Sequence, residues 1–243
     1  MHQAAPPPDF GLAMAQCDLA GCADELAQVG RIRIAPALLP EAAQALHTEL
    51  TDSTAWKRTM RQGKTEREIE PAALARLEPR QLQAIEQFAR QGDAKTFRFL
   101  HDAIRISADR DDRLARGLAI DLFVEAMNSE RVLRLITGLA GEPVTSFHGD
   151  ATRYLPGHFL TTHNDGRKFG RRVLALVLNL SHWHIDWGGL MLFHDANGDV
   201  ACGWTPQFNS VNLFSVPQDH SVSWVTPLAP VPRLAIAGWF FAD

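Results

Sequence analysis

The segment VLALVLNL at 173–180 is apolar at every position except Asn179, which is typical of a β-strand that is buried on both faces. On either side of it lie short alternating or apolar stretches that are separated by turns containing Pro and Gly. The further candidate strands are 145–154, 159–163, 190–194, 199–203, 211–216, 221–225 and 233–240. Between two of them, Asn197-Gly198 is a strong signal for a two-residue hairpin. A series of about eight short strands predicts a β-sandwich or a β-barrel.

The sequence before residue 145 has a helical pattern instead. Charged residues concentrate there, and no Glu follows Glu142. Apolar residues recur with the spacing of one helix face in 40–50, 79–90, 118–127 and 129–139. These four segments are therefore predicted to be helices.

Two other segments of this first part predict different structures. The alternation RIRI at 31–34 is that of a half-buried strand, whereas the charged segment 57–72 lacks apolar periodicity and is predicted to be an exposed loop. No flexible linker divides the chain, which favours a single domain. We expect it to consist of a loosely ordered N-terminal segment at 1–30, a helical buttress at 31–144 and a strand core at 145–243.

Composition limits the classes of partner. The chain has 243 residues and a net charge of −4, so no global charge attracts it to nucleic acid or to an anionic membrane. Its longest apolar stretches are shorter than the ~18 residues that cross a bilayer, and its first residues lack the features of a secretion signal. Three Cys are too few for a disulfide framework. We therefore expect a cytoplasmic protein without nucleic-acid or membrane partners; the oligomeric state stays open.

Histidines in the strand region point to a metal site. Three His-x-Asp triplets occur, at 148–150, 163–165 and 184–186. On a strand, residues i and i+2 point to the same face, so such a pair can offer one nitrogen and one carboxylate oxygen to the same ion. A third ligand from another strand would complete the facial triad of two His and one carboxylate, which leaves adjacent positions open on Fe(II).

Other catalytic motifs are absent from the sequence. It contains no His-Glu-x-x-His zinc motif, no Gly-x-Ser-x-Gly nucleophile elbow and no Gly-rich phosphate loop. His182 and His184 form a His-x-His pair, but the Glu that a cupin-type site adds does not follow it. Among these candidates an iron site is favoured.

The strand region resembles the prolyl 4-hydroxylase-like Fe(II)/2-oxoglutarate dioxygenases. The motifs that carry the resemblance occur in order and in register, and they are YLPGHFLTTHND at 154–165, LNL at 178–180, WGGL at 187–190, DHSV at 219–222 and RLAIAGWF at 233–240. Within that superfamily, the sequence is most similar to the microbial branch related to the ribosomal-protein prolyl hydroxylases. The resemblance implies an α+β protein with a double-stranded β-helix (jelly-roll) core and flanking N-terminal helices.

The resemblance also assigns roles by position. It implies that His163, Asp165 and His220 are the Fe(II) ligands and that Arg233 binds the distal carboxylate of 2-oxoglutarate. The phenol of Tyr154 would donate a hydrogen bond to the same co-substrate. These residues form the implied catalytic and cofactor-binding site, with O2 as second co-substrate and ascorbate as an accompanying cofactor.

The remaining candidate residues receive less specific roles. The triplet at 148–150 fits no position of the family and is interpreted as structural or substrate-facing, and the triplet at 184–186 as part of an exposed loop. The segments 57–72 and 182–187 are expected to frame the entrance of the site. Three tryptophans are expected to pack rather than to stack on substrate: Trp183, Trp187 and Trp239.

The implied activity is oxygenation of a carbon atom. The enzyme would hydroxylate a prolyl residue or another peptide or amino-acid carbon while converting 2-oxoglutarate and O2 to succinate and CO2. Two alternatives remain open. The same site could hydroxylate a small free metabolite, or the fold could serve as a non-catalytic sensor that binds iron and 2-oxoglutarate. The partner is accordingly a peptide, a protein or a small molecule.

Overall fold

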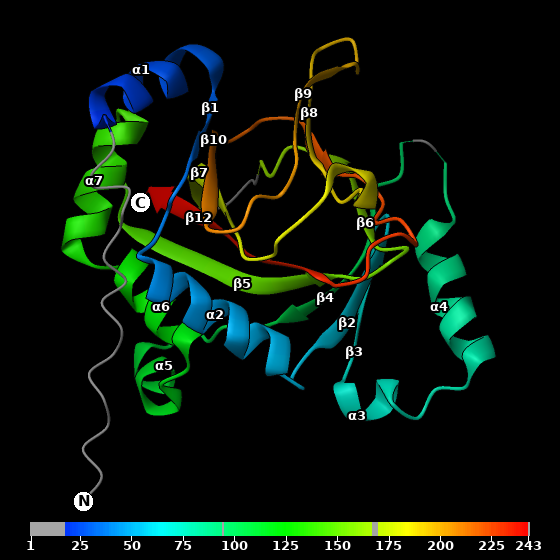
Figure 1. Cartoon of the computed structure of the whole chain (residues 1–243). Coiled ribbons are helices and arrows are strands. Elements are labelled where there is room, and N and C mark those ends of the chain that lie inside the picture. Colours follow the sequence, from blue (N-terminus) through cyan, green and yellow to red (C-terminus); the bar gives the residue numbers. More distant parts are fainter. Residues whose placement is uncertain (1–17, 94, 167–169, 243) are drawn as a thin grey trace, which may run out of the picture.

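One antiparallel sheet organises the chain (Figure 1). A computed structural model describes residues 18–93, 95–166 and 170–242. Within these residues the sheet has 12 strands, and the main path runs β1-β10-β7-β12-β5-β4-β6-β11-β8-β9, with β2 pairing β4 and β3. The strands are β1 Arg31–Ile34, β2 Lys57–Gln62, β3 Thr65–Ile69, β4 Arg98–Ile104, β5 Ser146–Tyr154, β6 Phe159–His163, β7 Arg171–Asn179, β8 Met191–His194, β9 Val200–Trp204, β10 Ser210–Ser215, β11 His220–Val222 and β12 Arg233–Ala242.

The sheet curls so that its two ends face one another. Strands β10 and β8 are far apart in the strand order, yet the ring centroids of Phe214 and Phe193 lie 5.3 Å apart. Both rings belong to an apolar cluster that also includes Met191 and Val222. This interior cluster fills one end of the curl and gives the jelly-roll arrangement expected for the core, because residues i and i+2 of each strand point inward together.

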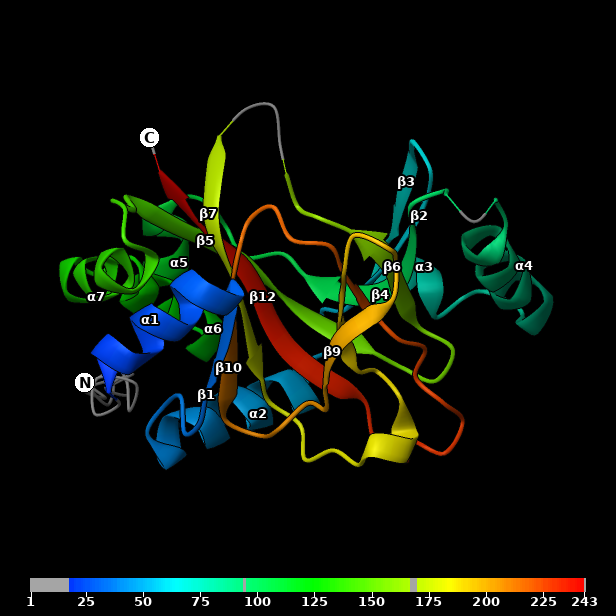
Figure 2. The same cartoon turned by 90° about the horizontal axis from the view of Figure 1, so that it is seen from above.

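Helices cover the opposite face of the central strands (Figures 1 and 2). They are α1 Leu19–Val29, α2 Pro40–Asp52, α5 Arg110–Arg116, α6 Ala119–Met127 and α7 Glu130–Ala140. The helices α3 Pro71–Leu74 and α4 Pro79–Arg90 lie on the other side of the molecule, against β2 and β4, and a short 3₁₀ helix spans Ile185–Trp187. The largest apolar core includes Leu46 of α2, Phe123 of α6 and Ile136 of α7, together with Leu178 and Ile236 of the sheet. The helices therefore support the strands that carry the candidate site.

The helices predicted at 40–50, 79–90, 118–127 and 129–139 are confirmed as α2, α4, α6 and α7. Specific residue types mark the start of α2 and both ends of α7. Pro40 occupies the first turn of α2, and Ser129 caps α7 by accepting a hydrogen bond from the backbone of Val132. Helix α7 ends at Gly141, whose φ of 71° suits the left-handed cap. No helix in the described part of the chain is long and apolar enough to cross a membrane.

The predicted exposed loop at 57–72 is wrong. This segment forms the hairpin β2–β3 and the short helix α3. Its charges are accommodated by pairing: Arg61 and Glu66 face each other across the hairpin with an N–O distance of 3.2 Å. Arg58 is buried and bonds to Asp102 of β4, which is itself fully buried. The sequence of this segment shows no alternation of apolar and polar residues, because its charged residues are stabilised on the strand by oppositely charged partners on a neighbouring strand.

The first part of the chain contributes to the same sheet. Strand β4 was not predicted, and with β1, β2 and β3 it joins the strands that follow residue 145. In the N-terminal segment, residues 1–17 lie outside the described residues. The following residues form α1 rather than loosely ordered chain, with Asp18 accepting a hydrogen bond from the backbone of Gly21.

Candidate metal and co-substrate site

A cavity of about 910 Å³ opens within the curl of the sheet. The structure brings all five residues of the predicted site to its wall: Tyr154, His163, Asp165, His220 and Arg233. They come from β5, β6, the turn after β6, β11 and β12. The site thus depends on strands that are distant in sequence and adjacent in the sheet.

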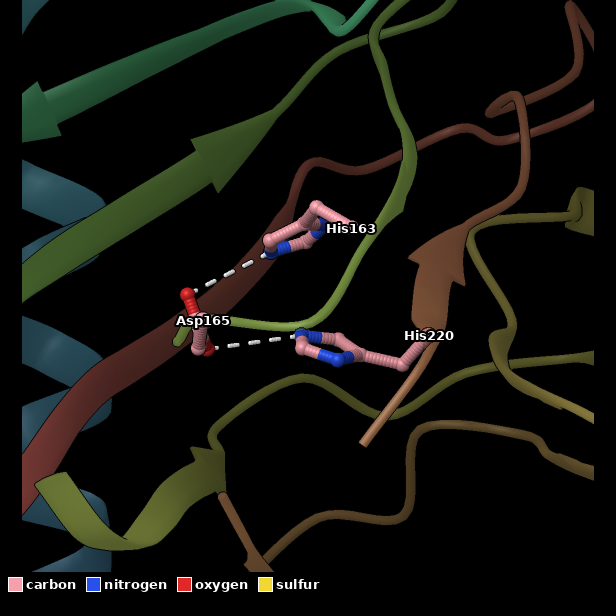
Figure 3. A group of neighbouring side chains, drawn as sticks. All are labelled: His163, Asp165 and His220. Atoms are coloured by element: carbon pink, nitrogen blue, oxygen red, sulfur yellow. Dashed lines mark ion pairs between the residues drawn. The ribbon is translucent and has the colours of Figure 1, made fainter. Parts of the chain in front are cut away.

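Three of these residues form the His–Asp–His cluster, namely His163, Asp165 and His220 (Figure 3). His163 ends β6 and His220 begins β11, and the antiparallel register places the two residues opposite each other. Asp165 lies in the turn after β6 with a φ of 61°, a left-handed conformation that Asp tolerates better than most residues. This turn brings the carboxylate back toward both imidazoles.

The potential ligand atoms converge. The Nε2 atom of His163 lies 3.6 Å from one carboxylate oxygen of Asp165, and Nε2 of His220 lies 3.5 Å from the other. The three ligand atoms all lie within 4.8 Å of one another. These distances allow one ion to contact all three side chains.

Hydrogen bonds on the far side of each ring fix which nitrogen faces the cluster. Nδ1 of His163 lies 3.0 Å from the carbonyl oxygen of Thr161, and Nδ1 of His220 lies 2.7 Å from that of Gln218. A carbonyl oxygen only accepts, so each Nδ1 carries the proton and donates it. The lone pair of each Nε2 is then directed into the cluster, as in metal-binding histidines whose second nitrogen bonds to a carbonyl.

Burial keeps both rings neutral. Burial lowers the pKa of His163. Burial and, to a smaller extent, the neighbouring His163 lower the pKa of His220 to about 4. Two neutral acceptor nitrogens thus face an acceptor carboxylate without a donor between them. A cation at their centre would remove this repulsion, so the donor set fits a divalent metal ion with two nitrogen ligands and one oxygen ligand.

Two further side chains orient Asp165, and the sequence did not identify them. The indole Nε1 of Trp239 donates to Oδ2 at 2.8 Å, and Nη1 of Arg172 donates to Oδ1 at 3.1 Å. The guanidinium of Arg172 also lies 3.6 Å from the centre of the Trp239 ring. Trp239 packs against the apolar cluster of the interior, as expected, and in addition supports the carboxylate of Asp165. Its position six residues after Arg233 on one strand, and so on the same face, is the signal that could have revealed it.

Arg233 and Tyr154 form a second polar group in the cavity. They are paired in the register of β12 and β5, and the guanidinium carbon lies 5.1 Å from the phenol ring centre. Arg233 is only 2 % exposed, and its Nε has no hydrogen-bond partner among the described residues. Burial lowers the pKa of Arg233 and raises that of Tyr154 to about 12, so the phenol remains a donor at neutral pH.

A buried guanidinium without an anionic partner is energetically unfavourable. Within the described residues Nε of Arg233 has no partner, so an anion entering the cavity would supply one. Gly189 leaves space for this side chain, because a Cβ at that position would lie 3.1 Å from Cδ of Arg233. The pair therefore fits a carboxylate bound by a planar guanidinium and a phenol.

The two other His-x-Asp triplets do not join the cluster. Asp150 accepts hydrogen bonds from Arg105 and from the backbone of Ile106, while His148 lines the cavity. The side chains of His184 and Asp186 are 60 % and 71 % exposed, which confirms the exposed loop. Of the expected entrance segments, the β2–β3 hairpin lines the cavity through Arg61 and Glu66, whereas 182–187 contributes no residue to its lining.

Comparison with known proteins agrees with this geometry. Residues 149–241 match the family model of the 2OG-Fe(II) oxygenase superfamily. The matched region contains the His–Asp–His cluster and the Tyr154–Arg233 pair. The matched family implies Fe(II) and 2-oxoglutarate, with O2, for the general reaction. No curated protein sequence matches the chain.

Solved structures share the fold at low sequence identity. A prolyl-4-hydroxylase from Pseudomonas putida is 20% identical with a TM-score of 0.54, and the match covers 93% of this chain and 99% of that one. A Trichoplax adhaerens prolyl hydroxylase in complex with a hypoxia inducible factor peptide fragment is 17% identical with a TM-score of 0.61, covering 94% and 92%. The α-ketoglutarate-dependent epimerase SnoN from nogalamycin biosynthesis is 13% identical with a TM-score of 0.53, covering 92% and 82%.

Proposed function

We propose that the chain is an Fe(II)/2-oxoglutarate-dependent hydroxylase. The observation that carries this proposal is the presence in one cavity of a cluster of facing acceptors and a buried cation that lacks an anion. The cluster of acceptors needs a metal ion, and the buried guanidinium of Arg233 needs a carboxylate. A 2-oxo dicarboxylic acid can meet both needs at once, because it has an oxo acid group at one end and a carboxylate at the other.

The proposed roles follow from the chemistry of each side chain. His163, Asp165 and His220 would hold Fe(II), with Asp165 partly neutralising its charge. Arg233 would bind the distal carboxylate of 2-oxoglutarate, and the Tyr154 hydroxyl would donate a hydrogen bond to the same molecule. When bound, the iron supplies the oxidative chemistry that couples decarboxylation of 2-oxoglutarate to succinate with insertion of one oxygen atom into a C–H bond. The chain itself orients the co-substrate and excludes water.

For the substrate, we propose a prolyl residue or another carbon atom in a peptide or amino acid. Support comes from the fold shared with two prolyl hydroxylases, one of them described in complex with a peptide fragment. The lining of the cavity also includes charged side chains of both signs, among them Arg61, Glu66 and Arg105, which suits a polar peptide better than an apolar ligand. A small free metabolite is the second candidate, because SnoN of nogalamycin biosynthesis shares the fold.

Uncoupled turnover tests the proposal. The Fe(II)-loaded chain is incubated with 2-oxoglutarate and O2, and succinate is measured with and without ascorbate. We expect iron-dependent succinate release that increases with a pool of proline-containing peptides more than with free amino acids. Absence of iron-dependent succinate in every pool would instead favour a non-catalytic binding module. Stimulation by free metabolites alone would favour the second candidate.

A further inference from the structure

A third polar residue lies in line with Tyr154 and Arg233. In the register of β4 and β5, Asp102 pairs with Arg153, so the preceding residue of β4, His101, lies opposite Tyr154. Tyr154 in turn pairs with Arg233 of β12. Directly opposed residues of antiparallel strands point to the same face, and all three side chains line the cavity. We name this set the His101–Tyr154–Arg233 row.

The position of His101 is well fixed. Its ring stacks on that of Tyr154, with centroids 5.2 Å apart and planes 21° apart, and it also contacts Phe99. On the opposite face of β4, Asp102 is fully buried between Arg58 and Arg153. This ion pair links β2, β4 and β5 and holds His101 in register with the rest of the row.

One ring nitrogen of His101 makes no hydrogen bond to the described residues. This nitrogen, Nδ1, is buried. Burial lowers the pKa of His101 to about 3, assisted by the nearby His158 and Arg105. The ring is therefore neutral and keeps one N–H donor and one acceptor. A buried polar group of this kind is unfavourable unless a ligand or a water bonds to it.

We propose that His101 is a co-substrate-binding residue: its imidazole donates a third hydrogen bond to the dicarboxylate that Arg233 and Tyr154 bind. This inference rests on the proposed function. A carboxylate has about four acceptor positions, which exceeds what a guanidinium and a phenol fill. The neutral imidazole adds a directional donor without adding a second buried charge, and its stacking on Tyr154 fixes the direction of the phenol. His101 thereby favours a carboxylate over an apolar group at this end of the co-substrate.

Two substitutions separate hydrogen bonding from packing. His101→Phe keeps a ring that can stack on Tyr154 but removes the donor, and His101→Gln restores a donor without the ring. 2-Oxoglutarate is titrated into the Fe(II)-loaded variants in the absence of O2, and the dissociation constant is measured. We expect His101→Phe to raise it about ten-fold, His101→Gln to recover part of this loss, and Fe(II) affinity to stay unchanged in both. For 2-oxopentanoate, which lacks the distal carboxylate, parent and His101→Phe should bind equally.

His158 provides the matched control. It is also buried, its Nδ1 also lacks a partner among the described residues and its pKa is also lowered to about 3, but it does not line the cavity. His158→Phe should therefore leave 2-oxoglutarate binding unchanged. Equal binding by His101→Phe and the parent, or equal weakening by His101→Phe and His158→Phe, would overturn the inference. Failure of the parent itself to bind 2-oxoglutarate would instead overturn the proposed function.

Discussion

The two polar groups of the cavity differ in how far the chain satisfies them. In the His–Asp–His cluster, each imidazole bonds to a carbonyl and Asp165 receives hydrogen bonds from Arg172 and Trp239. In the His101–Tyr154–Arg233 row, Arg233 and His101 each bury a nitrogen that has no partner among the described residues. The cluster is thus preorganised by the protein, whereas the row is completed by a ligand.

This difference suggests how the two sites respond to change. Removing a ligand from the cluster takes away one bond to the metal ion and that side chain's own supporting hydrogen bonds, while those of the other two ligands stay in place. Removing Arg233 takes away a charge that the unliganded protein buries at a cost. Substitutions in the row should therefore affect co-substrate binding much more than they affect the stability of the unliganded protein.

The largest expected effect is loss of the metal ion. His163→Ala or His220→Ala leaves two ligands, and we expect iron content after reconstitution and desalting to fall to near zero while the fold is kept. His184→Ala is the matched control, since His184 lies in an exposed loop and should bind iron like the parent. Equal iron content in all four proteins would show that the cluster is not the metal site.

A slightly smaller effect is expected for Arg233. Truncating one partner of a buried charged pair typically costs ~2–5 kcal/mol, and each ~1.4 kcal/mol changes affinity tenfold. Arg233→Ala should therefore weaken 2-oxoglutarate binding roughly thirty-fold or more, while Fe(II) affinity changes little. Arg233→Lys should recover only part of the lost 2-oxoglutarate affinity, because an ammonium group keeps the charge but cannot reproduce the planar guanidinium. Calorimetric titration without O2 measures this, and parent-like binding by Arg233→Ala would refute the assignment.

An intermediate effect is expected for Trp239. Trp239→Phe removes the 2.8 Å hydrogen bond to Asp165 but keeps an aromatic ring beside Arg172. A hydrogen bond to a charged group contributes ~1.5–3 kcal/mol, so Fe(II) affinity should fall about ten-fold or more. Trp183→Phe is the control, because its indole donates to the carbonyl of Gly188 at 2.7 Å, away from the cluster. If the two variants bind Fe(II) equally well, Trp239 does not orient Asp165.

The smallest expected effect is a pH dependence of stability. Burial lowers the pKa of His158 to about 3, below that of the unfolded chain, so the unfolded state binds the proton first. The resulting stability is complete above the unfolded pKa and is lost as pH falls toward the folded one. From pH 7.5 to pH 5.5 one such histidine lowers the free energy of unfolding by about 1.4 kcal/mol. Urea unfolding of His158→Phe should show a shallower pH dependence than the parent, and an identical slope would contradict this.

The sequence predicted the part of the fold in which side-chain alternation is undisturbed. Strand β7 is apolar from Val173 to Leu178 because both of its faces are covered there, and it was predicted within two residues at either end. The hairpin β2–β3 was missed because its residues are mostly charged and become acceptable on a strand only through partners such as Asp102 of β4. Such pairing depends on strand order, which local periodicity does not encode.

The same limit applies to the candidate site. The sequence predicted roles for His163, Asp165, His220 and Arg233 because the motifs around them follow one another in the order of the resembled family. The role of His101 was not recognised, because its place beside Tyr154 follows from the register of β4 with β5. That of Trp239 was not recognised either, because the sequence puts it on the same face as Arg233 but does not show that this face meets the turn at Asp165. Residues that support or extend the site through cross-strand neighbours thus require the structure.

The central claim is that one cavity binds a metal ion at the His–Asp–His cluster and a dicarboxylate that reaches from it to Arg233. Two ligands that contact each other in a site raise each other's affinity by the same factor. The most direct test is titration of 2-oxoglutarate into the parent chain without O2, in the presence and in the absence of Fe(II). The account predicts binding of one molecule per chain, at least about five-fold tighter with Fe(II), and an equal gain in Fe(II) affinity with 2-oxoglutarate. Equal dissociation constants with and without Fe(II) would contradict it.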